Sequence, residues 1–417
     1  MTQIEFAGPS RRSFFAENPS VLIFIALLGA FTALATILSE GFGIGLLSTS
    51  LVKTLGKTLC LCMIAIAMDL VWGYCGILSL GHFAFFGLGG YMIGMWLMYA
   101  RTEDIVAQSL ANAPLPPTEQ EIVDAIGVQI FGVVGSSDFP WIWAFADTLA
   151  IQLALVVLVP GLLALVFGWL AFRSRVTGVY LSILTQAMTL ALSLYLFQND
   201  SGLRGNNGLS GLQNLPGLDD TPQSVVSIWF LWASAFALAL TYLFAAWMVS
   251  GKFGSVIQAI RDDEARVRFL GYPVEGFKLF VFTLTAVVSG VAGALYYPQA
   301  GIINPAELAP IASIYLAVWV AIGGRGRLYG AVIGATVVSL LSSWFTGGRA
   351  PDVPLGFYTI QWVDWWQVLL GVGFVCVTLF APKGLGGLVD LLVDRSRLES
   401  ARAPADAAKA DPRPGES

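Results

Sequence analysis

Long apolar stretches recur along this chain, and they restrict its fold more than any other feature. A helix rises about 1.5 Å per residue, so roughly 20 apolar residues are needed to cross the hydrocarbon core of a bilayer. Hydrophobic residues make up 56% of the 417 residues and charged residues only 12%, a composition that soluble domains do not have. We therefore predict an all-α protein, a polytopic membrane helical bundle of about ten transmembrane helices.

The predicted spans are Val21–Leu38, Leu55–Tyr74, Leu78–Tyr99, Thr148–Phe172, Val176–Phe197, Val225–Val249, Phe277–Tyr297, Ile314–Ile322, Leu328–Phe345 and Trp365–Ala381. Ile314–Ile322 is too short to cross alone, which leaves two interpretations open. Either its helix begins near Leu308, or it is a broken helix sheltered by protein, because irregular backbone at membrane depth is tolerated only in such shelter.

The placement of Lys and Arg tests this topology, because short loops rich in these residues stay on the cytoplasmic side. With a cytoplasmic N-terminus, the spans leave most basic residues inside: Arg11, Arg12, Arg173, Arg175, Lys252, Arg261, Arg266, Arg268, Lys278, Arg325, Arg327 and Lys383. The outside keeps Lys53, Lys57, Arg101, Arg204 and Arg349. An added or missing span in the middle would scatter this charge. We therefore predict a multi-pass protein of the inner membrane with both termini cytoplasmic.

The same topology divides the chain into regions. Residues 1–20 form a cytoplasmic N-terminal segment, residues 21–388 the transmembrane domain, and residues 389–417 a cytoplasmic tail whose Ala-, Pro- and charge-rich composition predicts disorder. Within the domain, residues 101–140 form an external loop and residues 250–276 a cytoplasmic one. The external loop is acidic, and the formal net charge of the chain is −5, so nucleic acid is not a plausible partner.

The sequence contains no recognisable ATP-binding motif and no recognisable catalytic site. Gly56-Lys57-Thr58 ends like a phosphate-binding loop, but Leu51 stands where the earlier glycine is required. Neither the four cysteines nor the single histidine supplies a metal set, and no nucleophile is paired with a base. We predict no catalytic residue, no metal site and no cofactor bound by this chain. If ATP drives the protein, another chain must bind it.

Asp69 is the clearest ionisable residue within a predicted span. Such residues are costly in hydrocarbon and usually persist for a function, which would suit an ion-coupled carrier. Asp69 has no obvious cationic partner, however, so capping a broken helix or bonding to backbone is an equally good interpretation. An autonomous channel or secondary carrier is thus the weaker transport hypothesis.

Several motifs, taken in order, resemble one family of transport proteins. They are Leu70–Tyr74, Leu78–His82, Phe172–Tyr180, Gly205–Leu209, Gly301–Pro305, Gly323–Gly326 and Pro382–Gly384. From about Leu55 to Leu388 the chain resembles the LivM-type permeases of ABC importers for branched-chain amino acids and urea. The likeness is greatest to the urea branch. Tyr315 stands where an acidic residue is expected in that branch and Gln198 where a basic one is expected, so an amino acid stays open as the substrate.

The resemblance implies a coupling element in residues 250–276 that enters a cleft of ABC ATPase subunits, which would use ATP and Mg²⁺. Its residues are Arg261, Asp263, Glu264, Ala265, Arg268 and Gly271. The alternative is a solvated amphipathic loop between two spans. The other implied partners are a second, related permease subunit, an extracytoplasmic solute-binding protein and membrane lipid.

A path for urea needs hydrogen-bond partners, because the molecule is neutral and carries amide-like donors and a carbonyl acceptor. The candidate path residues are Ser79, His82, Thr185, Gln186, Asn206 and Asn207. The first two lie in a predicted helix break, where capping or packing competes as the role of His82. Interhelical bonding competes for Thr185, and an ordinary turn for Asn206-Asn207-Gly208.

Overall fold

Apolar helices make up most of the computed structural model, which describes residues 14, 18–110, 118–131, 140–176, 178–198, 201–218, 220–347, 353–354, 359–380, 383–387 and 390. Most of the predicted N-terminal segment and C-terminal tail lie outside the described residues. The same is true of Arg11, Arg12, Arg349 and two parts of the predicted external loop.

Eight helices in the described residues are long and apolar enough to cross a membrane. They are α2 (Pro19–Leu38), α3 (Thr49–Met68) with the π-helical segment η1 (Asp69–Tyr74), α4 (His82–Leu110), α6 (Leu149–Arg173), α7 (Val179–Phe197), α8 (Gln223–Ser250), α11 (Val274–Ala300) and α13 (Leu328–Thr346). The all-α class is therefore confirmed, and every predicted span falls on a helix. The number of membrane-length helices, however, is eight rather than the predicted value of about ten.

The other two predicted spans correspond to α12 (Pro310–Gly323) and α14 (Trp362–Phe380), of which Pro310–Gly323 and Trp362–Val377 count as shorter apolar helices. With 14 residues, α12 is too short to cross alone, as expected. It begins at Pro310, just after the 3₁₀ turn η5 (Pro305–Leu308), in agreement with the first interpretation, a start near Leu308.

Short elements connect these helices. They are α5 (Glu119–Phe131), η2 (Trp141–Trp143), η4 (Gly205–Asn207), β1 (Leu209–Ser210), α9 (Lys252–Asp262), α10 (Glu264–Phe269), β2 (Ile302–Ile303), β3 (Val353–Pro354) and β4 (Thr359–Ile360). β1 pairs with β2, and β3 pairs with β4, both antiparallel. The predicted external loop thus begins with the last turns of α4 and contains α5.

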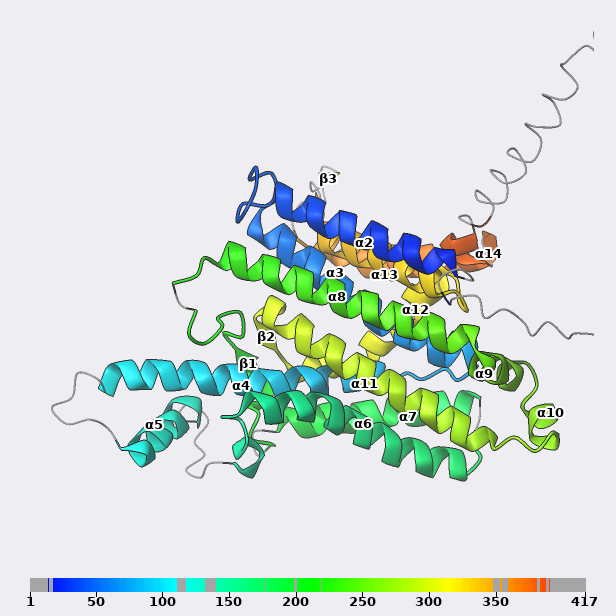
Figure 1. The fold of residues 1–417 in the computed structure, drawn as a ribbon, viewed down its shortest axis with the longest axis horizontal. Coiled ribbons are helices and arrows are strands. Elements are labelled where there is room, and N and C mark those ends of the chain that lie inside the picture. Colours follow the sequence, from blue (N-terminus) through cyan, green and yellow to red (C-terminus); the bar gives the residue numbers. More distant parts are fainter. Residues whose placement is uncertain are drawn as a thin grey trace, which may run out of the picture.

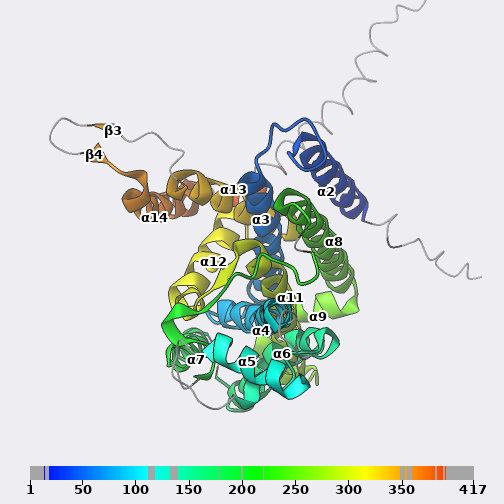
Figure 2. The same ribbon diagram turned by 90° about the vertical axis from the view of Figure 1, so that its left-hand side faces the viewer.

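The core of the bundle is formed by α3, α4 and α11, while α2 packs against α8 at the periphery (Figures 1 and 2). Glycines let α4 and α11 approach closely. A Cβ on Gly89 would lie 2.0 Å from the carbonyl oxygen of Gly290, and one on Gly293 would lie 1.8 Å from that of Phe86. Small residues at such crossings are a common device of membrane helices.

The connections alternate between two ends of the bundle, which we call the α9 end and the α5 end (Figure 1). Most described basic residues gather at the α9 end: Arg173, Arg175, Lys252, Arg261, Arg266, Arg268, Lys278, Arg325, Arg327 and Lys383. Lys53, Lys57, Arg101 and Arg204 lie toward the other end. The fold thus brings together the residues that the predicted topology assigns to one side of the membrane.

Candidate functional site

The predicted coupling element folds as two short helices, α9 and α10, that project at the α9 end (Figure 1). α9 is amphipathic and buries Ile257 and Ile260 against the bundle. Asp263 separates the two helices and caps α10, since its carboxylate accepts a hydrogen bond of 3.1 Å from the backbone amide of Arg266. Gly271 follows α10 with a φ of 88°, a left-handed conformation that favours glycine.

Glu264 holds α10 against the start of α11. Its carboxylate pairs with Lys278 of α11, and its other oxygen accepts a hydrogen bond of 3.0 Å from Arg268. Arg268 also pairs with Glu275 at 2.8 Å. The side chain of Lys278 is only 9% exposed, so this network is partly sheltered from water. Glu264 therefore serves within the chain, while Ala265 lies exposed on the same short helix.

Two large apolar side chains stand uncovered at the tip of this element. Phe269 is 91% exposed and Leu270 is 71% exposed. They lie at the α9 end, beyond the long apolar helices, and directly follow Arg268. Exposed apolar side chains in such a setting are typical of a surface that binds another protein. Sequence reasoning missed them, although an apolar pair within a polar loop is a readable signal.

The predicted helix break is confirmed: η1 ends at Tyr74 and α4 begins at His82. Hydroxyl groups from neighbouring helices bind the backbone that the break frees. The amide of Leu80 donates to Thr185 Oγ1 at 3.0 Å, and Ser182 Oγ donates to the carbonyl of Leu78 at 2.7 Å. We call this set of residues the helix-break cluster. Its hydroxyl groups pair with backbone groups inside the bundle that would otherwise lack a hydrogen-bond partner.

α11 and α12 complete the helix-break cluster. The amide of Phe83 donates to Ser313 Oγ of α12 at 3.1 Å, and His82 Nε2 lies 3.2 Å from Thr285 Oγ1 of α11. Both His82 and Ser79 are fully buried. Three of the predicted path residues, Ser79, His82 and Thr185, are thus brought together, in a closed place inside the chain.

The remaining predicted path residues lie apart from this cluster. Gln186 is half-buried on α7, while Asn206 and Asn207 are exposed in η4 at the α5 end. The backbone carbonyl of Asn206 accepts a hydrogen bond of 2.7 Å from Asn304. Gly208 follows with a φ of 62°, so this segment has the turn geometry that was the competing interpretation.

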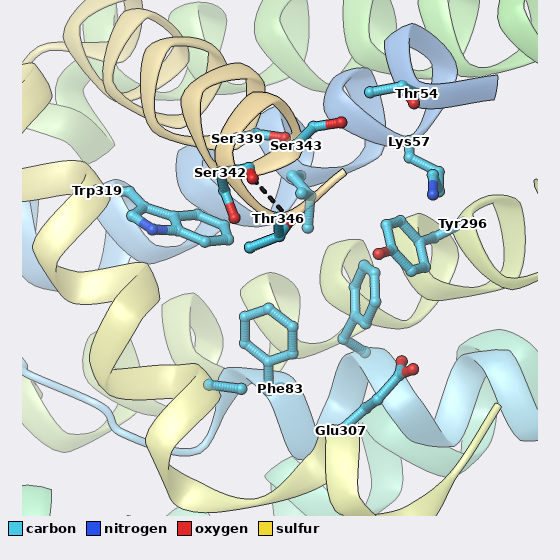
Figure 3. A pocket seen from close by; sticks show the side chains of 13 residues that line it. Thr54, Lys57, Phe83, Tyr296, Glu307, Trp319, Ser339, Ser342, Ser343 and Thr346 are labelled. Atoms are coloured by element: carbon cyan, nitrogen blue, oxygen red, sulfur yellow. Dashed lines mark hydrogen bonds between the residues drawn. The ribbon is translucent and has the colours of Figure 1, made fainter. Parts of the chain in front are cut away.

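An open polar cavity of about 380 Å³ lies between α3, α4, α11, η5, α12 and α13 (Figure 3). Four hydroxyl-bearing residues of α13 line one wall: Ser339, Ser342, Ser343 and Thr346. Their spacing places them on one face of the helix. The opposite wall is largely apolar, with Phe83, Phe86 and Trp319. The sequence contained this signal, but the predicted span 328–345 was read only as apolar.

The cavity also holds one cation and one carboxylate. Lys57 of α3 and Glu307 of η5 both line it, with Tyr296 between them (Figure 3). The two charged groups influence each other electrostatically but form no direct ion pair within 4.0 Å. The cavity can therefore offer both signs of charge to a small solute. Neither residue was predicted to line a path.

Over residues 50–378, the chain matches a protein family described as "Branched-chain amino acid transport system / permease component". The chain belongs to this family. A permease is a transport subunit, so the protein is not an enzyme, and its apolar helices make it a multi-pass membrane protein. The part of the expectation that concerned the permease family is thereby confirmed.

Curated relatives show how far the likeness extends. The chain is 27% identical over 205 residues to the high-affinity branched-chain amino acid transport system permease protein LivM of Escherichia coli, covering 43% of this chain and 48% of that relative. It is 28% identical over 145 residues to the autoinducer 2 import system permease protein LsrC of Yersinia pseudotuberculosis, covering 32% and 38%. The chain thus spans less than half the length of these relatives. No solved structure matches it.

Proposed function

We propose that this chain is the membrane-spanning permease subunit of an ATP-driven ABC importer, and that α10 is the element received by the ATPase. Membership of the permease family supports the first part. The exposed pair Phe269 and Leu270 carries the second, because nothing in the described chain covers these side chains. ATP and Mg²⁺ are bound by the separate ATPase subunits.

The proposed orientation places the α9 end in the cytoplasm. The concentration of Lys and Arg at that end supports it, since basic loops are retained on the cytoplasmic side. Both termini are then cytoplasmic, and the acidic α5 end faces an extracytoplasmic solute-binding protein. Closure of the two ATPases pushes on α10, and the permease changes the side to which its path is open.

The residues that line the polar cavity form one side of the solute path, and a second, related permease subunit forms the other side. The hydroxyl groups on α13 suit this role, because a solute that leaves water needs replacement hydrogen-bond partners. His82 and Thr185 act as positioning residues in this scheme. They hold the first turn of α4, from which Phe83 and Phe86 enter the cavity wall. The Ser79 hydroxyl is buried beside them and has no hydrogen-bond partner among the described residues. Gln186 follows Thr185 on α7, and Asn206 and Asn207 are exposed in η4 at the α5 end; a part for these three in the path is a prediction.

Urea is the first candidate substrate, because the sequence motifs were interpreted as resembling the urea branch of the family. The α13 hydroxyls offer donors and acceptors that match an amide-like solute. The chain then contributes selectivity through hydrogen bonds, since a site built to pair with an amide disfavours solutes that lack one.

A zwitterionic amino acid is the second candidate, favoured by the charges of the cavity. Lys57 can pair with an α-carboxylate and Glu307 with an α-ammonium group, while Phe83 and Trp319 offer apolar contact to a side chain. Urea carries no charge and gains little from such a pair.

The contact with the ATPase is tested by Phe269→Asp in the complete transporter. We expect the variant to insert in the membrane at the wild-type level, but to lose co-purification of ATPase subunits and ATP-dependent uptake, because a charge replaces an apolar contact. Ile44→Asp, at an exposed apolar position near the other end, is the matched control and should keep both. Wild-type co-purification by Phe269→Asp, or uptake by the isolated chain without an ATPase, would contradict the proposal.

The substrate is tested by uptake of labelled urea and labelled leucine into a strain that lacks this chain and is complemented with wild type or Lys57→Gln. If leucine is the substrate, loss of the cation should lower its uptake by roughly tenfold, in line with one lost charged contact. If urea is the substrate, Lys57→Gln should change its uptake by less than about threefold, because a neutral solute needs no ion pair.

A further inference from the structure

Three segments that are far apart in the sequence meet beneath the α9 end of the bundle. They are η1, the C-terminal turn of α9, and the turn that joins α12 to α13. The backbone amide of Gly326 in that turn donates a hydrogen bond of 2.7 Å to Asp69 Oδ1 in η1. Arg261 of α9 donates one of 2.8 Å to the carbonyl of Gly73, also in η1. We call this meeting point the Asp69 joint.

Charge adds to these hydrogen bonds. The guanidinium of Arg325 lies 4.9 Å from the centre of the Trp72 ring, a distance at which a cation is attracted by the ring face. Arg325 and Arg261 both face the buried carboxylate of Asp69. Burial lowers the pKa of the Arg325 guanidinium from its usual value, and Arg261 lowers it further while Asp69 opposes both. Asp69, for which the sequence offered no cationic partner, thus has two nearby cations and a backbone donor.

The parts of the joint are closely packed. A Cβ on Gly73 would lie 2.0 Å from Asp69 Oδ1 and 2.6 Å from the amide nitrogen of Gly326. A Cβ on Gly76 would lie 2.9 Å from Cγ of Arg261. Atoms packed this closely move together, since interiors of this density are displaced as units rather than compressed. The π-helical form of η1 is itself a feature that occurs often at functional sites.

Two of the three segments of the joint lead to walls of the cavity, and the third leads to α10. η1 continues α3 without interruption, and α3 contributes Thr54 and Lys57 to the cavity. The α12–α13 turn leads directly into α13, which contributes the row of hydroxyl groups that begins at Ser339. On the third side, α9 is followed at once by α10.

We propose that the Asp69 joint transmits displacement of α9 and α10 to α3 and α13, and thereby opens or closes the cavity. The inference rests on the proposed function, because it assumes that an ATPase pushes on α10. Asp69 and Arg261 are positioning residues in this scheme: neither lines the cavity, and neither stands at the exposed tip. The bundle moves because three backbone segments are tied at one point.

Gly73→Ala in the complete transporter tests the joint, because the added methyl group must push η1 away from the α12–α13 turn. We expect ATPase subunits to co-purify as with wild type and ATP hydrolysis to continue, while the number of solute molecules moved per ATP falls roughly tenfold. Gly29→Ala is the matched control, because nothing lies within 4 Å of a Cβ at that helical position. A wild-type ratio of uptake to hydrolysis in Gly73→Ala would overturn the inference.

Arg261→Gln is a second variant for the case in which Gly73→Ala does not fold. The Arg261 side chain is 31% exposed, so the change removes the bond to the Gly73 carbonyl without creating a buried cavity. The ratio of uptake to hydrolysis should fall, and Arg261→Lys, which keeps a cationic donor, should restore most of it. Equal ratios in the Gln and Lys variants would overturn the inference. Loss of ATPase co-purification by Phe269→Asp, with retention by Arg261→Gln, separates the joint from the docking contact.

Discussion

The helix-break cluster and the cavity are both polar regions inside an apolar bundle, but their hydroxyl groups have different surroundings. In the cluster, Ser182 and Thr185 bond to backbone groups of the segment between η1 and α4. In the cavity, Ser342 and Ser343 line open space. A polar residue within a membrane helix is therefore not by itself a sign of a solute path. The deciding question is whether the polar side chain is already hydrogen-bonded to a backbone group.

The physical reason for the difference lies in the regularity of the backbone. A continuous helix pairs its own amides and carbonyls, so its backbone does not need polar side chains as partners, although some hydroxyls still donate to it, as Thr346 Oγ1 does to the Ser342 carbonyl. A broken helix frees backbone groups, and leaving one unpaired in a dry interior costs about 1–3 kcal/mol. α13 is continuous through its row of hydroxyl groups, whereas residues 75–81 are not helical. The hydroxyl groups on α13 are therefore available for transport, whereas those of the helix-break cluster are needed to stabilise the fold.

The largest effect that would sharpen this comparison is expected from Ser342→Phe. The ring would occupy the cavity from the α13 wall, and no described hydrogen bond of the Ser342 hydroxyl would be lost. We expect uptake to fall to the level of the strain lacking the chain, while the melting temperature in detergent stays unchanged. Leu158→Phe on the exposed face of α6 is the control, and it should transport normally. Normal uptake by Ser342→Phe would place the path elsewhere.

The next effect concerns stability instead of transport. Thr185→Val removes the hydroxyl to which the Leu80 amide donates, so we expect the free energy of unfolding to fall by about 1–3 kcal/mol, and uptake per folded molecule to fall less than in Ser342→Phe. Denaturant unfolding in detergent measures the first quantity. The control is Thr189→Val, because the Thr189 hydroxyl bonds only to the Thr185 carbonyl of its own helix. Equal losses in both variants would mean that the Leu80 amide finds another partner.

Much of the fold was predictable because membrane helices are recognisable in a sequence as long apolar runs. The break before His82 was also readable, since turn formers interrupt the apolar run between Trp72 and His82. The predicted number of spans includes α12, which η5 and Gly324, with a φ of 112°, limit to 14 residues. The sequence already showed that this apolar segment is too short to cross alone.

The site was less predictable, because function there depends on which side chains meet. Glu264 was expected at the ATPase contact as one residue of the implied coupling element, and that role stays a prediction. In the fold it pairs with Lys278, which lies on another helix. The exposed apolar side chains of the element are those of Phe269 and Leu270, which were not among the expected residues. No local pattern shows that α10 folds back onto α11. The hydroxyl row on α13, in contrast, repeats at helical spacing and was available to sequence reasoning.

The smallest effect is expected inside the helix-break cluster itself, from Ser182→Ala. Here the lost hydroxyl is a donor to the carbonyl of Leu78, at 2.7 Å. An under-bonded carbonyl is tolerated better than an orphaned amide, because it has two lone pairs with which to find other partners. We therefore expect the free energy of unfolding to fall by about 0.6 kcal/mol, the average for hydrogen bonds between membrane helices, and by less than for Thr185→Val. Both variants are measured in the same detergent and compared with their double mutant, since Thr185 Oγ1 also donates to the Ser182 carbonyl at 2.9 Å. If Ser182→Ala costs as much as Thr185→Val, the cluster does not act by rescuing an orphaned amide, and its contrast with the cavity would rest on burial alone.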